Sequence, residues 1–171
     1  NNCFLVDSFF VNEPTLLQDS VITNSPTCNG FSDGDIYLYP FGSVAPYTFL
    51  WSNGDTTSML ENIIAGEYSV IITDQNNCVL YDTVDIDQPF ILSYSSIVDS
   101  ISCFGYNDGS IDLSVSGGTL PYSYVWNTGD TTEDISNLYA GSYVVNVLDL
   151  NNCLFIANIS VLEPDELFTF F

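Results

Sequence analysis

The chain of 171 residues contains no lysine, arginine or histidine, and its 22 acidic side chains give a formal net charge of −22. Without cations it cannot neutralise the phosphates of a nucleic acid or bind an anionic membrane surface by basic attraction. The commonest general base, the Schiff-base nucleophile and the phosphate-binding lysine of a P-loop are also missing. The composition therefore excludes nucleic-acid partners and most enzyme chemistry.

Long apolar runs are missing as well. No stretch of about 18 apolar residues occurs, so we expect no transmembrane helix and no direct insertion into a membrane. The chain is nevertheless 46% hydrophobic and 15% aromatic, which is well above the content of a disordered acidic tail. We therefore expect a folded protein whose polar surface carries charge of one sign.

The sequence repeats itself at a constant interval. Asn-Asn-Cys ends at Cys3, Cys78 and Cys153, and residues 15–89 align with residues 90–164 without a gap, with 28 identities in 75 positions. We expect residues 1–14 to be the tail of a preceding copy and residues 165–171 to begin a following one. A unit of this length is typical of a small domain in a tandem array.

Each complete copy has two cysteines, at positions 28 and 78 in the first and at 103 and 153 in the second. Because a domain of this size has a marginal core, a disulfide would stabilise it by restricting the unfolded chain. We predict the pairs Cys28–Cys78 and Cys103–Cys153, with the partner of Cys3 outside the chain. The alternative is metal binding, but two thiolates without histidine cannot complete a four-ligand zinc site. Disulfides in turn predict an oxidising compartment.

Apolar and polar residues alternate with a period of two, which indicates half-buried strands. Ile36 and Leu38 alternate with Tyr37 and Tyr39, and Trp51 ends the next predicted strand as a core residue. We count six or seven short strands per copy and no helix. Gly-x-Tyr in both copies, ending at Tyr68 and Tyr143, is similar to the tyrosine that opens a late strand of immunoglobulin-like domains. The predicted fold class is all-β, with tandem immunoglobulin-like β-sandwich repeats.

Four joined motifs resemble the SprB-type repeat of very large surface adhesins of gliding Bacteroidota. They are Cys-x-Gly-x-x-Asp-Gly, Gly-x-x-x-Pro-Tyr-x-x-x-Trp-x-x-Gly-Asp-Thr-Thr, Asn-x-x-Ala-Gly-x-Tyr-x-Val and Asp-x-Asn-Asn-Cys, beginning at positions 28, 42, 62 and 74 and again one period later. Two departures are Ser43, where the family usually has a second glycine, and Asn77 and Asn152, where it often has glycine. The resemblance implies an extracellular repeat of a filamentous adhesin, exported by the type IX route and moved along the cell surface.

Acidic loops are the first candidate site. Carboxylate and carbonyl oxygens are the ligands that calcium prefers, and acidic residues follow the first cysteine and precede the second. The candidate calcium ligands are Asp33, Asp35, Asp74, Asp108 and Asp149. The alternative is that Asp-Gly marks a turn and that the aspartates cap turns.

Exposed aromatic side chains are the second candidate site. Tyr37, Tyr39 and Phe41 fall on the strand face opposite Ile36 and Leu38, whereas the second copy has Asp112, Ser114 and Ser116 there. Such side chains would stack on the sugar rings of a surface polysaccharide or bind another protein. The alternative is that a neighbouring repeat or another chain covers them.

Modification sites are the third candidate feature. Asp followed by Ser or Thr and then an aliphatic residue or Thr resembles the O-glycosylation signal of Bacteroidota. The candidate acceptors are Ser20, Thr56, Thr83, Ser100 and Thr131.

We expect a non-enzymatic protein of the cell surface with neighbouring repeats as its first partners, because a small sandwich leaves little room for the cleft that paired catalytic carboxylates need. The leading hypothesis is the extended stalk of a large adhesin in attachment and gliding. The alternatives are a carbohydrate- or protein-binding module and a subunit of a self-assembling extracellular filament, in which other copies would be partners. No cofactor is expected beyond calcium.

Overall fold

The computed structural model describes residue 3 and residues 5–166, and the chain folds into two compact units. Among the described residues, unit 1 comprises those up to 25 and residues 32–87, and unit 2 comprises residues 26–31 and 88–166. The predicted beginning of a following repeat at 165–171 lies outside the described residues from 167 onwards. The short segment 26–31 therefore belongs to unit 2, although the sequence repeat places it in the first copy.

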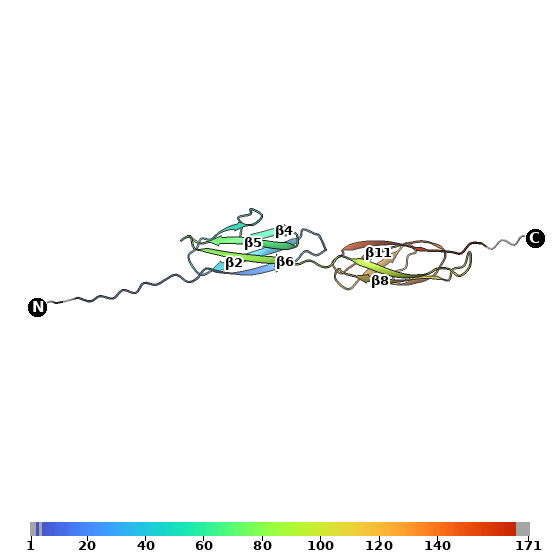
Figure 1. Cartoon of the computed structure of the whole chain (residues 1–171), viewed down its shortest axis with the longest axis horizontal. Helices are drawn as coiled ribbons and strands as arrows, with labels where there is room; N and C mark the ends of the chain where they lie inside the picture. The colour runs from blue at the N-terminus through green and yellow to red at the C-terminus, as the bar shows by residue number, and fades with distance from the viewer. Residues whose placement is uncertain (1–2, 4, 167–171) are drawn as a thin grey trace, which may run out of the picture. The chain divides into compact units, whose positions relative to one another are not determined.

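Unit 1 is built from six strands in two antiparallel sheets (Figure 1). One sheet has the order β1-β2-β4 and the other the order β3-β5-β6. The strands are β1 (Gln18–Asn24), β2 (Gly34–Phe41), β3 (Thr48–Trp51), β4 (Met59–Ile63), β5 (Gly66–Thr73) and β6 (Val79–Ile86).

Unit 2 repeats this arrangement with the sheets β7-β8-β10 and β9-β11-β12. Its strands are β7 (Ser93–Asp99), β8 (Gly109–Ser116), β9 (Ser123–Trp126), β10 (Ile135–Leu138), β11 (Gly141–Leu148) and β12 (Leu154–Val161). The all-β prediction is confirmed, and the part of the chain described here holds twelve strands and no helix. None of its segments forms a helix long and apolar enough to cross a bilayer.

The core of each unit consists of the inward residues of both sheets, as the alternation predicts. Trp51 and Trp126 are each 2% exposed, and both indole N–H groups donate to a backbone carbonyl six residues further on, at 2.9 Å. Around them pack Ile36, Leu38, Leu60, Val70, Ile72, Val84 and Ile86 in unit 1, and Ile111, Leu113, Ile135, Val145, Val147, Ala157 and Ile159 in unit 2. Because the indole N–H, the only polar group of the side chain, is hydrogen-bonded, burying each tryptophan leaves no unsatisfied polar side-chain atom.

The tyrosine of each Gly-x-Tyr motif lies near the start of a strand, as the sequence suggested, and its hydroxyl makes a hydrogen bond that the sequence analysis did not predict. The Tyr68 hydroxyl donates to the carbonyl of Ile64 at 3.0 Å, and the Tyr143 hydroxyl donates to that of Tyr139 at 2.9 Å. In both cases the hydroxyl ties the start of a strand to the backbone four residues upstream, as the tyrosine corner of immunoglobulin-like sandwiches does.

The loops of each unit gather at two opposite ends. In unit 2 the leading end consists of residues 90–92, the loop 117–122 and the β11–β12 turn 149–153, which hydrogen-bond to one another through Gly118 N to Phe90 O and Leu150 N to Thr119 O. The trailing end consists of the loop 100–108 and residues 162–164, joined through Ile101 N to Leu162 O. Strand β8 runs from the trailing end to the leading end. Its eight residues span about 26 Å at the usual rise per residue.

Candidate functional site: a disulfide-linked segment at the leading end of unit 2

The predicted disulfides Cys28–Cys78 and Cys103–Cys153 are wrong, and a partner of Cys3 outside the chain stays a prediction. Cys28 is bonded to Cys153, with Cα atoms 5.7 Å apart and 125 residues between them in sequence. Among the described residues Cys3, Cys78 and Cys103 are unbonded and exposed. The bond thus joins a cysteine of the first sequence repeat to one of the second, and both belong to unit 2.

The geometry of one repeat explains why the pairing within a repeat fails. In unit 2 Cys103 lies in the loop before β8, at the trailing end, whereas Cys153 lies in the β11–β12 turn at the leading end. The length of β8, about 26 Å, separates the two ends, and a disulfide requires Cα atoms about 4.4–6.8 Å apart. Cys28 and Cys78 stand at the same places relative to β2 and the β5–β6 turn. Neither cysteine can reach its partner in the same copy.

Hydrogen bonds hold the segment Pro26–Phe31 on unit 2 in addition to the disulfide. The side-chain amide of Asn29 donates to the carbonyl of Pro89 at 2.9 Å, and the backbone N–H of Gly30 donates to Gln88 Oε1 at 2.6 Å. The side-chain amide of Asn151 donates to the carbonyl of Thr27 at 2.9 Å. Pro26 is fully buried and Cys28 is 4% exposed. The segment is therefore held by packing and hydrogen bonds both before and after Cys28.

Asp149 shapes the turn that presents Cys153. Its carboxylate is 4% exposed and accepts the backbone N–H groups of Cys153 at 2.9 Å, Asn151 at 2.9 Å and Thr119 at 2.8 Å. A buried carboxylate with three N–H donors remains hydrogen-bonded without a counter-ion. Asn152 takes the left-handed conformation at φ 62°, as Asn77 does at 64°. Asparagine adopts this region more readily than most residues, so both turns accommodate it.

The same turn in unit 1 has the same cap but an exposed cysteine. Asp74 is 4% exposed and accepts the backbone N–H of Cys78 at 2.6 Å and the hydroxyl of Ser43. The Ser43 hydroxyl, followed by the backbone N–H donors, holds the pKa of this carboxyl below its usual value. Ser43 replaces the second glycine of the motif in the left-handed conformation, at φ 49°. The turn in unit 1 therefore has the same aspartate cap as the turn in unit 2, although Cys78 forms no disulfide.

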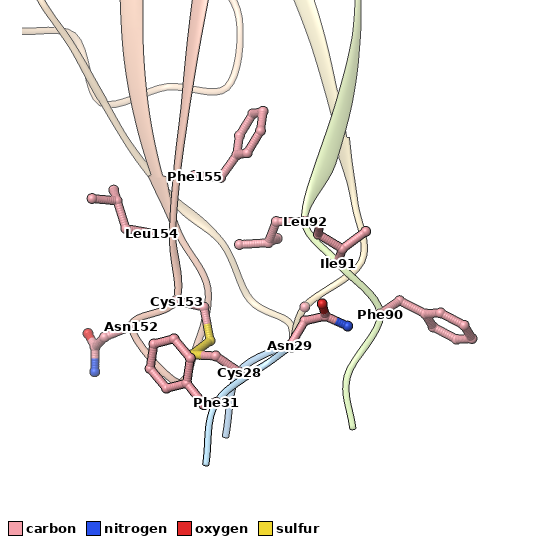
Figure 2. Close-up of a pocket in the computed structure, with 11 residues that line it drawn as sticks. Cys28, Asn29, Phe31, Phe90, Ile91, Leu92, Asn152, Cys153, Leu154 and Phe155 are labelled. Carbon is pink, nitrogen blue, oxygen red and sulfur yellow. A yellow bond between two sulfur atoms is a disulfide. The ribbon is translucent and has the colours of Figure 1, made fainter. Parts of the chain in front are cut away.

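A pocket of ≈ 420 Å³ lies beside the disulfide (Figure 2). It is lined by residues 90–92, by residues of strand β12 and by Phe31 of the segment 26–31, which lies beside the Cys28–Cys153 disulfide in Figure 2. Its apolar lining residues are Phe31, Phe90, Ile91, Leu92, Leu154 and Phe155. Phe31 is still 54% exposed and Leu154 58%. The lining residues include no titratable side chain, so the pocket offers contact area and no acid–base chemistry.

The predicted calcium ligands do not converge. In the described part of the chain no three acidic, cysteine or histidine side chains come close enough to hold a metal ion. Asp108 instead accepts the Ser102 hydroxyl at 2.6 Å and the Ser102 N–H at 3.0 Å, and these bonds lower its pKa. Asp35 accepts the N–H of Asn62 at 3.4 Å. The turn-capping alternative describes Asp74, Asp108 and Asp149, and calcium binding by these residues or by Asp33 stays an untested prediction.

The predicted aromatic site lies on the outward face of the β1-β2-β4 sheet. Tyr39 is 52% exposed and Phe41 49%, while Tyr37 is half-buried between Ile22 and Met59 on the neighbouring strands. The carboxylate of Asp35, with that of Glu61, raises the pKa of Tyr37. The face therefore combines accessible rings with nearby carboxylates. Its ligand stays a prediction.

All five predicted glycosylation acceptors, Ser20, Thr56, Thr83, Ser100 and Thr131, are exposed. Exposure is necessary for modification and leaves the prediction untested.

Sequence reasoning missed the bridged segment and the role of Asn151. The signal was present in the repeat itself, because the first cysteine of one copy and the second cysteine of the next also stand at a fixed spacing, of 125 residues. Only the strand order shows that the shorter spacing within one copy connects opposite ends.

Comparison with protein families gives a match to the SprB repeat over residues 20–56 and again over residues 95–131. The two matched segments are one period apart, and the predicted resemblance is confirmed. Comparison with curated protein sequences gave no match.

Twenty-five chains of known structure match, and immunoglobulin-domain proteins are among them. A structure from a study of Dscam isoform specificity is 9% identical with a TM-score of 0.38, covering 89% of this chain and 47% of that one. The N-terminal eight immunoglobulin domains of Down syndrome cell adhesion molecule are 10% identical with a TM-score of 0.43, covering 89% of this chain and 25% of that one. An amphioxus IgVJ-C2 molecule is 12% identical with a TM-score of 0.34, covering 84% of this chain and 96% of that one. The chain thus spans about half the length of the first of these structures and a quarter of the length of the second.

Proposed function

We propose that this chain is a segment of the stalk of a large extracellular adhesin on the cell surface, with a structural and non-enzymatic role in attachment and gliding motility. The match of the SprB repeat to both copies carries the proposal. The net charge of −22 supports it, because like-charged neighbouring repeats repel and favour an extended array. Export by the type IX route belongs to the same proposal.

Labelling of intact cells tests this proposal. An antibody raised against the 171-residue chain is expected to stain unpermeabilised cells, and an external protease is expected to remove the signal. Deleting the repeats from the gene should abolish surface spreading and reduce attachment. Staining that requires permeabilised cells, or spreading and attachment that are unchanged in the deletion strain, would contradict the proposal.

A second candidate function is carbohydrate binding by the outward face of the β1-β2-β4 sheet. The exposure of Tyr39 and Phe41 favours it, since rings held on a rigid strand stack on sugars without losing much conformational freedom. The second repeat provides a matched control, because it carries Asp112, Ser114 and Ser116 at the equivalent positions of a similar strand.

The experiment is sedimentation of the chain with a panel of insoluble polysaccharides. The triple variant Tyr37→Asp, Tyr39→Ser, Phe41→Ser copies the second repeat and should fold, so that loss of co-sedimentation would support a sugar site. Equal co-sedimentation of the variant and the native chain would exclude this face.

A further inference from the structure

The bonded and unbonded cysteines occupy equivalent positions. Cys103 stands one period after Cys28, and Cys78 stands one period before Cys153. Cys28 and Cys153 are buried and bonded to each other, whereas Cys103 and Cys78 are exposed. Each unbonded cysteine is thus equivalent to one half of the observed bond.

The surroundings of each unbonded cysteine repeat those of its bonded equivalent. Gly105 N–H donates to a carboxylate oxygen of Glu163 at 3.4 Å, as Gly30 N–H donates to the side-chain oxygen of Gln88. The hydrogen bond from Tyr106 N to Cys103 O matches that from Phe31 N to Cys28 O. The Asp74 cap on Cys78 matches the Asp149 cap on Cys153. Both loops therefore have the conformation that forms the bond.

A pocket also lies beside Cys103 at the trailing end of unit 2. This second pocket, of ≈ 440 Å³, is lined by Ser102, Cys103, Phe104, Pro164, Asp165 and Glu166. Phe104 is 49% exposed and Tyr106 56%. The equivalent segment 26–31 has the Asp149–Cys153 turn against it. Cys103 cannot use the turn of its own repeat, because that turn lies at the opposite end of β8.

We propose that Cys28–Cys153 is one member of a staggered series, in which Cys103 bonds the Asn-Asn-Cys turn of the following repeat and Cys78 bonds the first cysteine of the preceding repeat. This inference rests on the proposed function, since it requires neighbouring repeats in a longer chain. Each bond forms by thiol–disulfide exchange with a disulfide-containing oxidant. One cysteine thiolate attacks the oxidant, the second displaces it, and the oxidant leaves as a dithiol with the two electrons and two protons.

The stagger has a mechanical consequence that bonds within one repeat would not have. Because each bond spans more than one period, every peptide bond of the array lies inside at least one disulfide-closed loop. A single cut in the backbone then leaves the filament covalently continuous. When the filament is pulled, the shortest covalent path contains about 25 residues for every two repeats, or roughly 85 Å fully extended, instead of about 500 Å for two unravelled repeats.

Disulfide mapping of the native full-length protein tests the series. The protein is alkylated with N-ethylmaleimide, unfolded, digested with endoproteinase Asp-N and chymotrypsin without reduction, and analysed by mass spectrometry. We expect the Cys103 peptide to be linked to an Asn-Asn-Cys peptide from the following repeat, and no alkylated Cys103. In the Cys103→Ser variant that partner peptide should become alkylated, while the Cys28–Cys153 link persists.

Failure of the disulfide series and failure of the proposed function give different results. A link between Cys103 and Cys153, or alkylated Cys103 in the native protein, would overturn the series and leave the adhesin stalk intact as a proposal. A native protein without a further repeat beyond residue 164 would overturn the proposed function itself.

Discussion

Units 1 and 2 share a fold but differ in the side chains at the edge where the first strand of one sheet meets the last strand of the other. At the edge where β1 meets β6 in unit 1, Asp19 is half-buried, and one oxygen of its carboxylate is buried without a hydrogen-bond partner. Burial, with the neighbouring carboxylate of Asp82, raises the pKa of Asp19. Unit 2 has Tyr94 and Ala157 at these positions, and the Tyr94 ring lies 5.5 Å from that of Phe155. The fold therefore tolerates an unfavourable pair of acids in one copy where the other has an aromatic contact.

The units differ in the same way at the leading end. Unit 2 has a buried, bonded cysteine in its β-turn, and unit 1 has an exposed thiol in a turn with the same aspartate cap. Both comparisons indicate that unit 2 is the more stable unit. They also indicate that its advantage comes from the bridged segment and the sheet edge, since the tryptophan cores are alike.

The largest expected effect comes from removing the disulfide. The double variant Cys28→Ser, Cys153→Ser should lower the free energy of unfolding of unit 2 by about 4 kcal/mol, because the bond closes a long loop in the unfolded chain. The matched variant Cys78→Ser, Cys103→Ser should leave both units unchanged within about 0.5 kcal/mol. Calorimetry of the two-unit chain checks both. An equal effect of the two double variants would remove the difference between the units at this end.

The next largest effect is expected at Asp149. The Asp149→Ala variant leaves three backbone N–H groups without their acceptor and should cost about 3 kcal/mol in unit 2. Urea unfolding followed by tryptophan fluorescence measures this. Since Trp51 reports on unit 1 and Trp126 on unit 2, Trp51→Phe isolates the signal of unit 2. A free energy of unfolding that changes no more than it does for an ordinary surface substitution would show that the turn does not depend on this cap.

A smaller effect of opposite sign is expected at Asp19. The Asp19→Asn variant removes a charge from the Asp19–Asp82 pair and should stabilise unit 1 by about 1 kcal/mol or less at pH 7, because solvent screens a half-buried pair. Because the folded-state pKa of Asp19 is raised, the native residue is most favourable below its unfolded value near 4, and this contribution is lost as pH rises through the folded pKa. The advantage of the variant should therefore shrink between pH 7 and pH 4. An advantage that is constant over this range would contradict the assignment.

The sequence was sufficient for the parts of the fold that alternate or repeat. The burial of Ile36, Leu38 and Trp51 follows from periodicity, and the place of Tyr68 and Tyr143 near the start of a strand follows from a short motif. These features are local, so one copy contains all the information about them.

The disulfide was mispredicted because it depends on which end of the sandwich each loop occupies. The number of residues between Cys28 and Cys78 is compatible with a disulfide. The bond is excluded only because the loop before β2 and the β5–β6 turn lie at opposite ends of that strand. The acid pair was also invisible, since Asp19 and Asp82 stand near opposite ends of the first repeat and meet only through the packing of β1 on β6. Long-range facts of this kind require the strand order.

The absence of lysine and arginine permits a direct test of the disulfide that joins the two sequence repeats, because one arginine creates a unique trypsin site. In the Asp87→Arg variant trypsin cuts after residue 87. This position lies outside the loops that the predicted disulfides within each repeat would close, and inside the loop closed by Cys28–Cys153. We predict a single species of about 19 kDa on a non-reducing gel and two fragments after reduction. Asn12→Arg is the matched control, since residue 12 precedes Cys28 and its fragment should separate with or without reductant. Two fragments from cut Asp87→Arg without reductant would show that Cys28 and Cys153 are not bonded, and would contradict the account.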